Sequence, residues 1–480
     1  MSGINTQYVM STAPEAESGF MASALGVLAC GCLLVAILFP GLPTTLVFCF
    51  LAAVFSFYRV DIFLFAAVLL LPLSPVMNTG LRLHNISSLL QLSMFVGFAC
   101  YQFALGVSLQ SWILRKGINR LAVAFVLVVL ACTLVFHRPT TSSMRACSEL
   151  VAGLCFFLTL GEWVQSESQV KRILHFILAS GIAVSLFGFY QALIDDYGDL
   201  YFWLYPKQAE ILEPWTGRIT SVLNYSNSLA GYINLVTPIA VGLLLIPIGA
   251  RSKILAAVSL AVCAAALLLT ASRGGLGSFL TILLIAAIYL TQQAKTRKWL
   301  LIVSLVTLAI GMILVFGVIR TPWAEEDPST AMRFLFWGVA GVLFISSPIL
   351  GIGYGNFRDL YDLPGIASGV FDVHNLYLQL LAETGVVGFV AFGAMIAFII
   401  RQCIRALRRP KRDLSTIVNF AALGGVIALL LHGFVDFLFI VSPQFTSLFW
   451  LILALVVVTE RWQQNISSIK TTEIANGSGL

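Results

Sequence analysis

Four residues in the second half of the chain have the side-chain types needed for group transfer: His374, Arg218, Arg273 and Arg333. A histidine titrates near neutral pH, so His374 could remove a proton from a hydroxyl group. An arginine stays charged at any working pH, and its planar guanidinium matches the oxygens of a phosphate. These residues therefore predict one general base and a cationic site for a phosphate-bearing substrate.

Two of the arginines lie beside small residues that let a ligand approach closely, in Gly217-Arg218-Ile219-Thr220-Ser221 and Ser272-Arg273-Gly274-Gly275. Asn227 and Ser272 are predicted to support them. The alternative is an arginine that extends to lipid headgroups or pairs with a local carboxylate. An arginine at a membrane boundary usually has an anionic partner, which favours the binding interpretation for this pair.

His374 begins a helix-like run, His374-Asn375-Leu376-Tyr377, with a carboxylate before it and Glu383 after it. We predict that Asn375 supports the histidine and that Glu383 is a structural carboxylate. Another histidine, His432, precedes Asp436 by four residues, and the two could form a structural hydrogen bond. A lone histidine is more often structural than catalytic, so the neighbours of His374 carry its assignment.

The composition predicts the fold class. Of the 480 residues, 59% are hydrophobic and 10% are charged, and the mean hydropathy is +0.94, whereas soluble domains carry roughly 25% charged residues. Apolar runs long enough to cross a bilayer recur along the chain. The sequence therefore predicts an all-α polytopic transmembrane helical bundle. The net charge of +6 reflects membrane topology, and no nucleic-acid partner is expected.

We expect about 12–14 membrane-spanning helices. The predicted spans lie at about residues 20–39, 44–58, 62–77, 87–105, 121–136, 147–160, 173–192, 229–248, 254–270, 276–290, 299–319, 386–400, 417–437 and 445–458. If the N-terminus is cytoplasmic, most of the 28 Lys and Arg residues fall in cytoplasmic loops, as the positive-inside rule requires. The four candidate site residues then share the outer face.

The long segment at residues 320–385 is expected to be an outer loop that contains short helices. Its apolar stretch at residues 334–346 is too short to span, so we predict a helix lying near the headgroups. Residues 1–19 form a predicted cytoplasmic tail without a cleavable signal peptide, residues 20–214 the N-terminal transmembrane helices, and residues 460–480 a cytoplasmic C-terminal tail.

The sequence offers no pattern for a cofactor or a metal. Gly351-x-Gly353-x-Gly355 has no preceding strand, so we interpret it as a tight turn after Pro348 and not as a nucleotide-binding motif. The outer loops lack a cluster of metal ligands, and the nine cysteines are scattered through apolar runs as small buried residues. We therefore expect no metal and no cofactor.

Three motifs together resemble the O-antigen ligase/O-antigen polymerase family of bacteria: Ser272-Arg273-Gly274-Gly275, Pro348-Ile-Leu-Gly351-Ile-Gly353 and His374-Asn375…Glu383-Thr384-Gly385. Their order, spacing and common face carry the resemblance, which covers roughly residues 215–440. Residues 215–459, with the loop 320–385, then form an O-antigen ligase-like catalytic membrane region with a GT-C-like arrangement.

The resemblance implies a metal-independent inverting glycosyltransferase of the bacterial inner membrane, whose site faces the periplasm. Its donor would be a glycan on undecaprenyl diphosphate, gripped by Arg218, Arg273 and Arg333, and its His374 would activate the acceptor hydroxyl. The partners would be this donor, a lipid or glycan acceptor, membrane lipids and other polysaccharide-assembly proteins.

The acceptor stays open at this stage. An O-antigen ligase acting on lipid A-core is favoured over an O-antigen or exopolysaccharide polymerase, and a protein O-oligosaccharyltransferase is a third reading. A transporter or flippase of lipid-linked sugars is the alternative from another class. The hydropathy pattern lacks the internal repeat and paired broken helices expected of many transporters, which disfavours that alternative.

Overall fold

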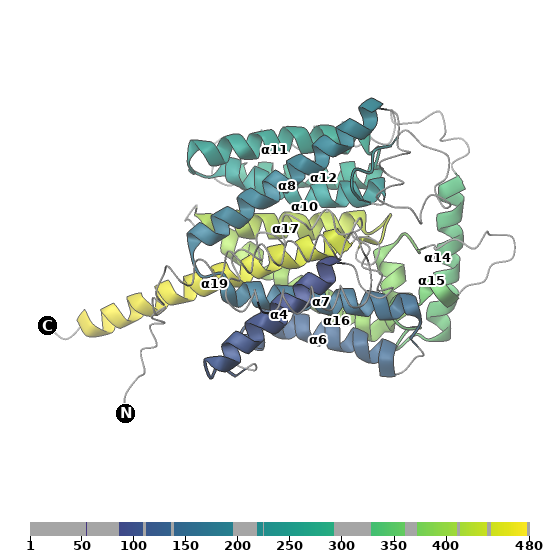
Figure 1. Cartoon of the computed structure of the whole chain (residues 1–480), viewed down its shortest axis with the longest axis horizontal. Coiled ribbons are helices and arrows are strands. Elements are labelled where there is room, and N and C mark those ends of the chain that lie inside the picture. The colour runs from purple at the N-terminus through teal and green to yellow at the C-terminus, as the bar shows by residue number, and fades with distance from the viewer. Residues whose placement is uncertain are drawn as a thin grey trace.

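The computed structural model describes residues 54, 86–108, 112–135, 139–194, 218–223, 225–291, 328–360, 372–409, 413–438 and 443–477. These residues are helical, with connecting turns (Figure 1). The helices are α4 (Ile86–Ala104), α6 (Gly117–Leu130), the π-helical turn η2 (Ala131–Val135), α7 (Thr141–Trp163), α8 (Glu167–Ile194), α10 (Ser226–Leu245), α11 (Ala250–Leu269), α12 (Arg273–Thr291), α14 (Pro328–Ser346), α15 (Phe357–Leu360), α16 (Leu376–Leu407), α17 (Leu414–His432) and α19 (Pro443–Gly477).

The described part of the chain contains nine helices long and apolar enough to cross a membrane. They correspond to nine of the predicted spans, and α4, predicted at residues 87–105, is a somewhat shorter apolar helix. The predicted all-α polytopic bundle is therefore confirmed. The predicted spans at residues 20–39, 44–58, 62–77 and 299–319 lie outside the described residues.

Helix α10 forms the centre of the bundle. Its residues are buried almost throughout, and it contacts α8, α11, α12, α17 and α19. A methyl group on Gly242 would approach the backbone of Ile417 to 3.5 Å, and one on Gly424 would meet Pro238 at 2.7 Å. These glycines let α10 and α17 pack closely, as expected where van der Waals contact drives helix association in lipid.

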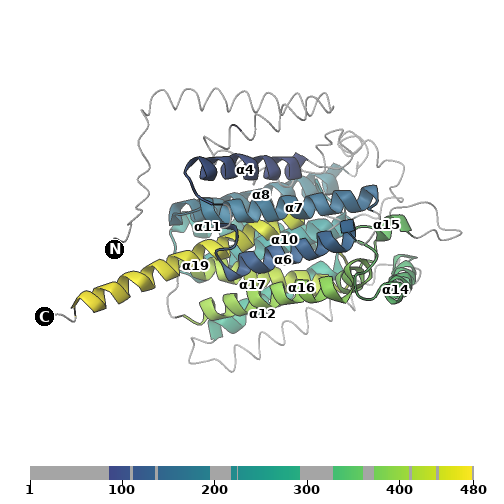
Figure 2. The same cartoon turned by 90° about the horizontal axis from the view of Figure 1, so that it is seen from below.

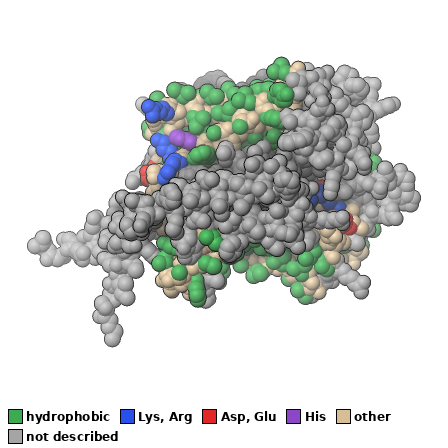
Figure 3. All heavy atoms as spheres, viewed as in Figure 1, with side chains coloured by type: hydrophobic (Ala, Val, Ile, Leu, Met, Phe, Trp, Pro, Cys, Tyr) green, Lys and Arg blue, Asp and Glu red, His purple; other side chains and the backbone are tan. Residues whose placement is uncertain are grey.

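The predicted basic loops gather at one end of the bundle. Glu162 near the end of α7 binds both Arg115 and Arg461, and Asp413 caps the start of α17. Figure 3 shows several Lys and Arg side chains at the left end of the described surface and others near the right end, with hydrophobic side chains on much of the described surface above and below. Helices α10, α12 and α16 begin at the opposite end, where α14 and α15 lie (Figure 1).

Helix α14 does not run with the bundle. It lies across the end of the other helices in both views (Figures 1 and 2), and its apolar part, Met332–Ser346, is shorter than the spanning candidates. The prediction of a helix near the headgroups agrees with this placement. The helix is longer than expected because it begins at Pro328, a residue suited to the first helical turn.

Two helices extend beyond the predicted spans. Residues 376–385, which continue the helix-like run predicted to begin at His374, join the span predicted at residues 386–400 to form α16, which starts at Leu376 and is kinked at Gly385. Asn375 caps this start. Residues 460–477, in the predicted C-terminal tail, continue α19 as helix.

Candidate functional site

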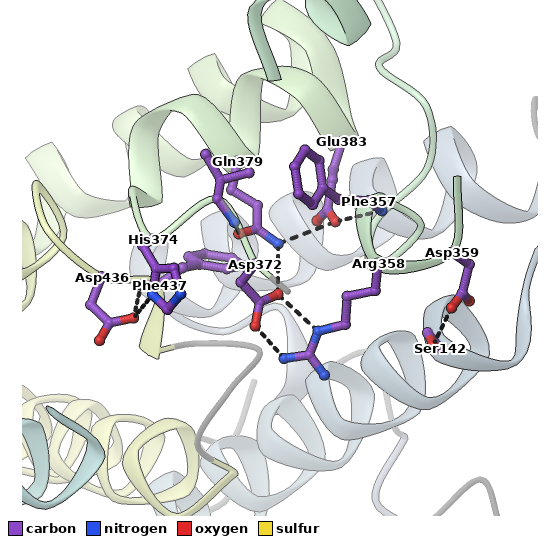
Figure 4. A network of polar contacts seen from close by, with 11 residues as sticks. Ser142, Phe357, Arg358, Asp359, Asp372, His374, Gln379, Glu383, Asp436 and Phe437 are labelled. Atoms are coloured by element: carbon purple, nitrogen blue, oxygen red, sulfur yellow. Dashed lines mark hydrogen bonds and ion pairs between the residues drawn. The ribbon is translucent and has the colours of Figure 1, made fainter. Parts of the chain in front are cut away.

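The His374 side chain lies next to the carboxylate of a residue far away in the sequence. Its Nδ1 lies 3.3 Å from Oδ1 of Asp436, in the turn that follows α17 (Figure 4). About a third of the His374 side chain is exposed, at 34%, whereas Asp436 is buried. If the carboxylate is ionised it can only accept, so Nδ1 donates and Nε2 is left for a substrate. This is the arrangement of a general base oriented by a carboxylate.

The electrostatics of this pair agree with those roles. Burial alone would lower the pKa of His374, but the hydrogen bond with Asp436 and the negative charges of Asp436 and Asp372 together raise it above its ordinary value. Burial would raise the pKa of Asp436, but the bond to His374 and the nearby histidines hold that pKa below its usual range. Asp436 is therefore ionised at neutral pH.

Hydrogen bonds to the turn after α17 hold the backbone around His374, which has an unusual left-handed conformation. Its φ of 53° lies in the left-handed region, which costs a non-glycine residue about 1 kcal/mol or more. The Leu376 amide donates to the Gly433 carbonyl at 2.7 Å, and the Asn375 side chain donates to the Phe434 carbonyl at 3.1 Å. These contacts keep His374 above Asp436.

From the other side, an ion pair fixes the residues just before His374. Arg358 in α15 donates from Nε to Asp372 at 2.8 Å and from a second nitrogen to the other carboxylate oxygen (Figure 4). Gln379 donates to the same carboxylate at 3.3 Å and accepts from the Val373 amide at 3.2 Å. Asp372 thus raises the pKa of Arg358 against the effect of its burial, and the loop carrying His374 is tied to two elements.

Glu383 supports the loop that carries His374 from inside the protein. Its side chain is fully buried, and Oε1 accepts from the Phe357 amide at 3.1 Å and from Gln379 at 3.3 Å. It joins α16 to the start of α15, and it is shielded from the surface. The geometry agrees with a structural carboxylate and not with a group that touches a substrate.

The glycine-rich stretch forms a tight turn that docks onto α16. The amides of Ile352 and Gly353 donate to the carbonyls of Ala382 and Glu383 at 2.9 and 2.8 Å. Gly351 and Gly385 both have positive φ, and a Cβ on either would come within 2.3 Å of the other segment's backbone. These close contacts require glycine, and they hold the turn that leads into α15 against the start of α16.

The first predicted arginine lies at the end of α11. Arg218 donates from Nε to the Thr270 carbonyl at 2.8 Å and from a terminal nitrogen to Oδ1 of Asn227 at 3.1 Å. Ser272 lies two residues after Thr270. Its hydroxyl oxygen accepts a hydrogen bond from the Gly275 amide at 3.2 Å and so caps the start of α12. The structure therefore brings together Arg218, Asn227 and the start of α12, where Arg273 is exposed.

Gly274 connects this arginine group with the histidine group. A Cβ on Gly274 would meet Val435 Cγ2 at 2.4 Å and His432 Cδ2 at 3.1 Å. The start of α12 therefore packs against the turn that carries Asp436, the partner of His374. Because the amides at a helix start point outward with partial positive charge, α12 adds a second attraction for an anion beside Arg273.

Arg333 approaches from the helix that lies across the bundle. Its positive charge acts on His374, where it lowers the pKa, and it also acts on His432. Helix α14 packs through Phe336 and Ala340 against the turn after Gly351 and the first part of α16. Three arginines, from three separate segments, are thus arranged at the end of the bundle that holds His374.

The structure corrects one contact that the spacing allowed and adds one ion pair. Both ring nitrogens of buried His432 lack a hydrogen-bond partner among the described residues, so the side-chain hydrogen bond to Asp436 that the spacing allows is not formed. Asp436 instead serves His374, 62 positions earlier. The pairing of Arg358 with Asp372 was also missed, although both residues flank the predicted motifs, because sequence spacing does not show which charges meet.

Within the described ranges, no group of three or more His, Cys, Asp or Glu side chains could hold a metal ion. At the site, His374 is instead paired with Asp436, and Asp372 with Arg358. The chemistry that this set of side chains can supply is proton transfer at His374 and stabilisation of negative charge by the arginines.

The fold and its polar end define a multi-pass helical membrane protein with an arginine-rich site beside a histidine–aspartate pair. Residues 258–393 match a family model described as O-antigen ligase. This match confirms the resemblance to the O-antigen ligase/O-antigen polymerase family over that region, and it implies chemistry of the membrane glycosyltransferase type. No curated protein matches the chain at a significant level.

The matched region contains Arg273, Arg333, His374 and Glu383, whereas Arg218 and Asp436 lie outside it. Helix packing brings these two to the same end of the bundle. The candidate site therefore includes residues outside the region that the family model matches.

Proposed function

We propose that this protein transfers a glycan from undecaprenyl diphosphate to an acceptor hydroxyl at the periplasmic face of the bacterial inner membrane. The observation that carries the proposal is the His374–Asp436 pair, at the end of the bundle where Arg218, Arg273 and Arg333 are arranged. The basic clusters at the opposite end support a cytoplasmic assignment for that end and a periplasmic one for the site.

In the proposed step, Nε2 of His374 takes the proton of the acceptor hydroxyl while the hydroxyl oxygen forms a bond to the anomeric carbon. The bond between that carbon and the diphosphate oxygen breaks on the opposite face, so the anomeric configuration is inverted. The leaving diphosphate gains negative charge in the transition state. Arginines arranged in advance stabilise that charge more than they stabilise the ground state.

Asp436 assists by stabilising the imidazolium that forms on His374 during the transfer. The carboxylate is buried, and its Oδ1 also accepts the Phe437 amide at 2.8 Å, which fixes its direction. The same side-chain set supplies a base and charge stabilisation from protein groups, which supports a metal-independent reaction. Full activity in the presence of a strong chelator is the expected result.

We favour an O-antigen ligase that uses lipid A-core as acceptor, since the matched family model carries that description. A polymerase would use a second lipid-linked repeat, and a protein O-oligosaccharyltransferase would use a serine or threonine. All three need the same donor site and base. Presenting the purified protein with each acceptor, and identifying the product by mass spectrometry, distinguishes them.

The decisive experiment uses purified protein and a glycan linked to undecaprenyl diphosphate. His374→Ala should abolish release of undecaprenyl diphosphate, while binding of the donor persists because the arginines remain. His175→Ala is the control, since His175 binds Ser252 at the opposite end of the bundle. Unimpaired transfer by His374→Ala would refute the catalytic assignment, and NMR showing retained anomeric configuration would refute the direct displacement.

A further inference from the structure

Helix α14 exposes an apolar face that no other described element covers. Phe336 and Ala340 point into the protein, whereas the opposite side presents Phe334, Val342 and Ile345, which are 64%, 67% and 76% exposed. We define the α14 stripe by the residues on this outer side: Phe334, Leu335, Gly338, Gly341, Val342 and Ile345. It is about 17 Å long at the helical rise per residue.

The composition of the stripe predicts contact with hydrocarbon. No charged residue occurs between Arg333 and Arg358. Helices that lie on a membrane surface normally keep a charged face towards water, whereas α14 is apolar on both sides.

Two glycines make the stripe shallow in its middle. A Cβ added to Gly338 or to Gly341 would meet no atom within 4 Å. The larger side chains of Phe334, Val342 and Ile345 stand on either side of them along the helix. The stripe therefore has a depression that suits a flexible, branched hydrocarbon chain.

The stripe continues onto the surface of a spanning helix. The Val386 and Val387 amides of α16 donate to the carbonyls of Pro348 and Ile349 at 2.9 and 3.2 Å. Ile349 is exposed, as are Val386 and Val390 on the outer side of α16. An apolar path thus leads from α14 to a side of the bundle that would face lipid.

The other end of the stripe meets the site. Arg333 immediately precedes Phe334, and its charge acts on His374. A molecule with an anionic head beside Arg333 and a hydrocarbon tail along α14 would match both the charge and the apolar surface. A polyprenyl diphosphate has this structure.

We infer that the α14 stripe binds the isoprenoid chain of the lipid diphosphate donor and directs it from the site towards the outer side of α16. The inference rests on the proposed function, because it takes the donor to be a polyprenyl diphosphate. It assigns to the α14 stripe a part of the donor affinity that is separate from the binding of the diphosphate by the arginines.

A binding experiment tests this without requiring transfer. The full-length protein, with p-benzoylphenylalanine in place of Val342, is illuminated with radiolabelled undecaprenyl diphosphate in lipid nanodiscs. We expect labelling that unlabelled undecaprenyl diphosphate competes away and geranyl diphosphate does not. The same substitution at Ile254, which is exposed on α11 at the other end of the bundle, is the control. Equal labelling at both positions, insensitive to competition, would show that α14 only contacts bulk lipid and would overturn the inference.

A kinetic experiment tests it where transfer is measurable. Val342→Ser and Ile345→Ser together should raise KM for the undecaprenyl-linked donor about tenfold, because apolar contact is lost, and leave kcat unchanged. KM for a geranyl-linked donor should stay the same, and Ile254→Ser should change neither value. Equal changes for both donors, or none for the long one, would refute the inference. If the wild-type protein transfers no glycan, the proposed function fails, and the labelling result still decides the role of α14.

Discussion

Removing the charge of Asp436 while keeping its hydrogen bonds gives a direct test of the histidine–aspartate pair. Asp436→Asn can keep an oxygen that accepts from the Phe437 amide and from Nδ1 of His374, so the ring orientation is preserved. Because Asp436 raises the pKa of His374, its neutralisation should lower that pKa. The rise of kcat/KM with pH, which follows deprotonation of the free base, should then move to lower pH.

The expected loss of rate follows from the geometry. The separation of 3.3 Å is longer than in strong charge-assisted bonds, and a third of His374 is exposed to solvent screening. We therefore expect Asp436→Asn to lower the plateau kcat about tenfold, or about 1.4 kcal/mol in the barrier. Asp436→Ala removes the orienting oxygen too and should cost about a hundredfold.

The assay is release of undecaprenyl diphosphate from the glycan donor, measured from acidic to alkaline pH. Asp359→Asn is the matched control, because Asp359 is exposed at the same end of the bundle and its side chain binds Ser142. It should leave the pH profile unchanged. A profile for Asp436→Asn that coincides with wild type, or shifts to higher pH, would refute the role assigned to this carboxylate.

The remaining predictions concern three other residues at this end of the bundle. Arg333→Gln should move the pH profile to higher pH, opposite to the shift for Asp436→Asn, because the arginine lowers the pKa of His374. It should also raise KM for the donor. An unchanged pH profile would argue against the proximity of Arg333 and His374. Asp372→Asn leaves a largely buried arginine without its anion and should destabilise the protein by about 3 kcal/mol, seen as a lower Tm in detergent. Gly274→Ala places a methyl group 2.4 Å from Val435 and should lower kcat, and Val435→Ala in the same chain should restore it. Failure of that rescue would show that the packing of α12 does not set the rate.

Much of the fold could be predicted because a bilayer restricts the choices. Backbone groups in lipid must be paired within a helix, so a long apolar run has one stable form. The spans predicted in the described part correspond to helices, and the short apolar stretch after Arg333 lies across the bundle as expected. The helix-like run from His374 could be recognised, but the sequence did not show that this run continues through a kink at Gly385 into the following span.

The candidate site could be predicted only in its residue types. His374 and the small-residue turns around Arg218 and Arg273 were recognisable, since their chemistry is a property of single side chains and their neighbours. The partner of His374 could not be recognised in this way. Asp436 has two candidate histidines, and the one nearer in sequence, His432, does not bind its side chain.

The sequence alone determined that the chain forms a helical membrane bundle, which residues could act as base and as cationic grip, and which end of the bundle they share. Those properties follow from hydropathy, charge and short-range spacing. Only the tertiary structure decided that Asp436 orients His374, that Arg358 is engaged by Asp372 at the loop carrying the base, and that α14 has a bare apolar face. These depend on helices far apart in sequence coming together, and close approaches at glycines such as Gly274 help to set those contacts.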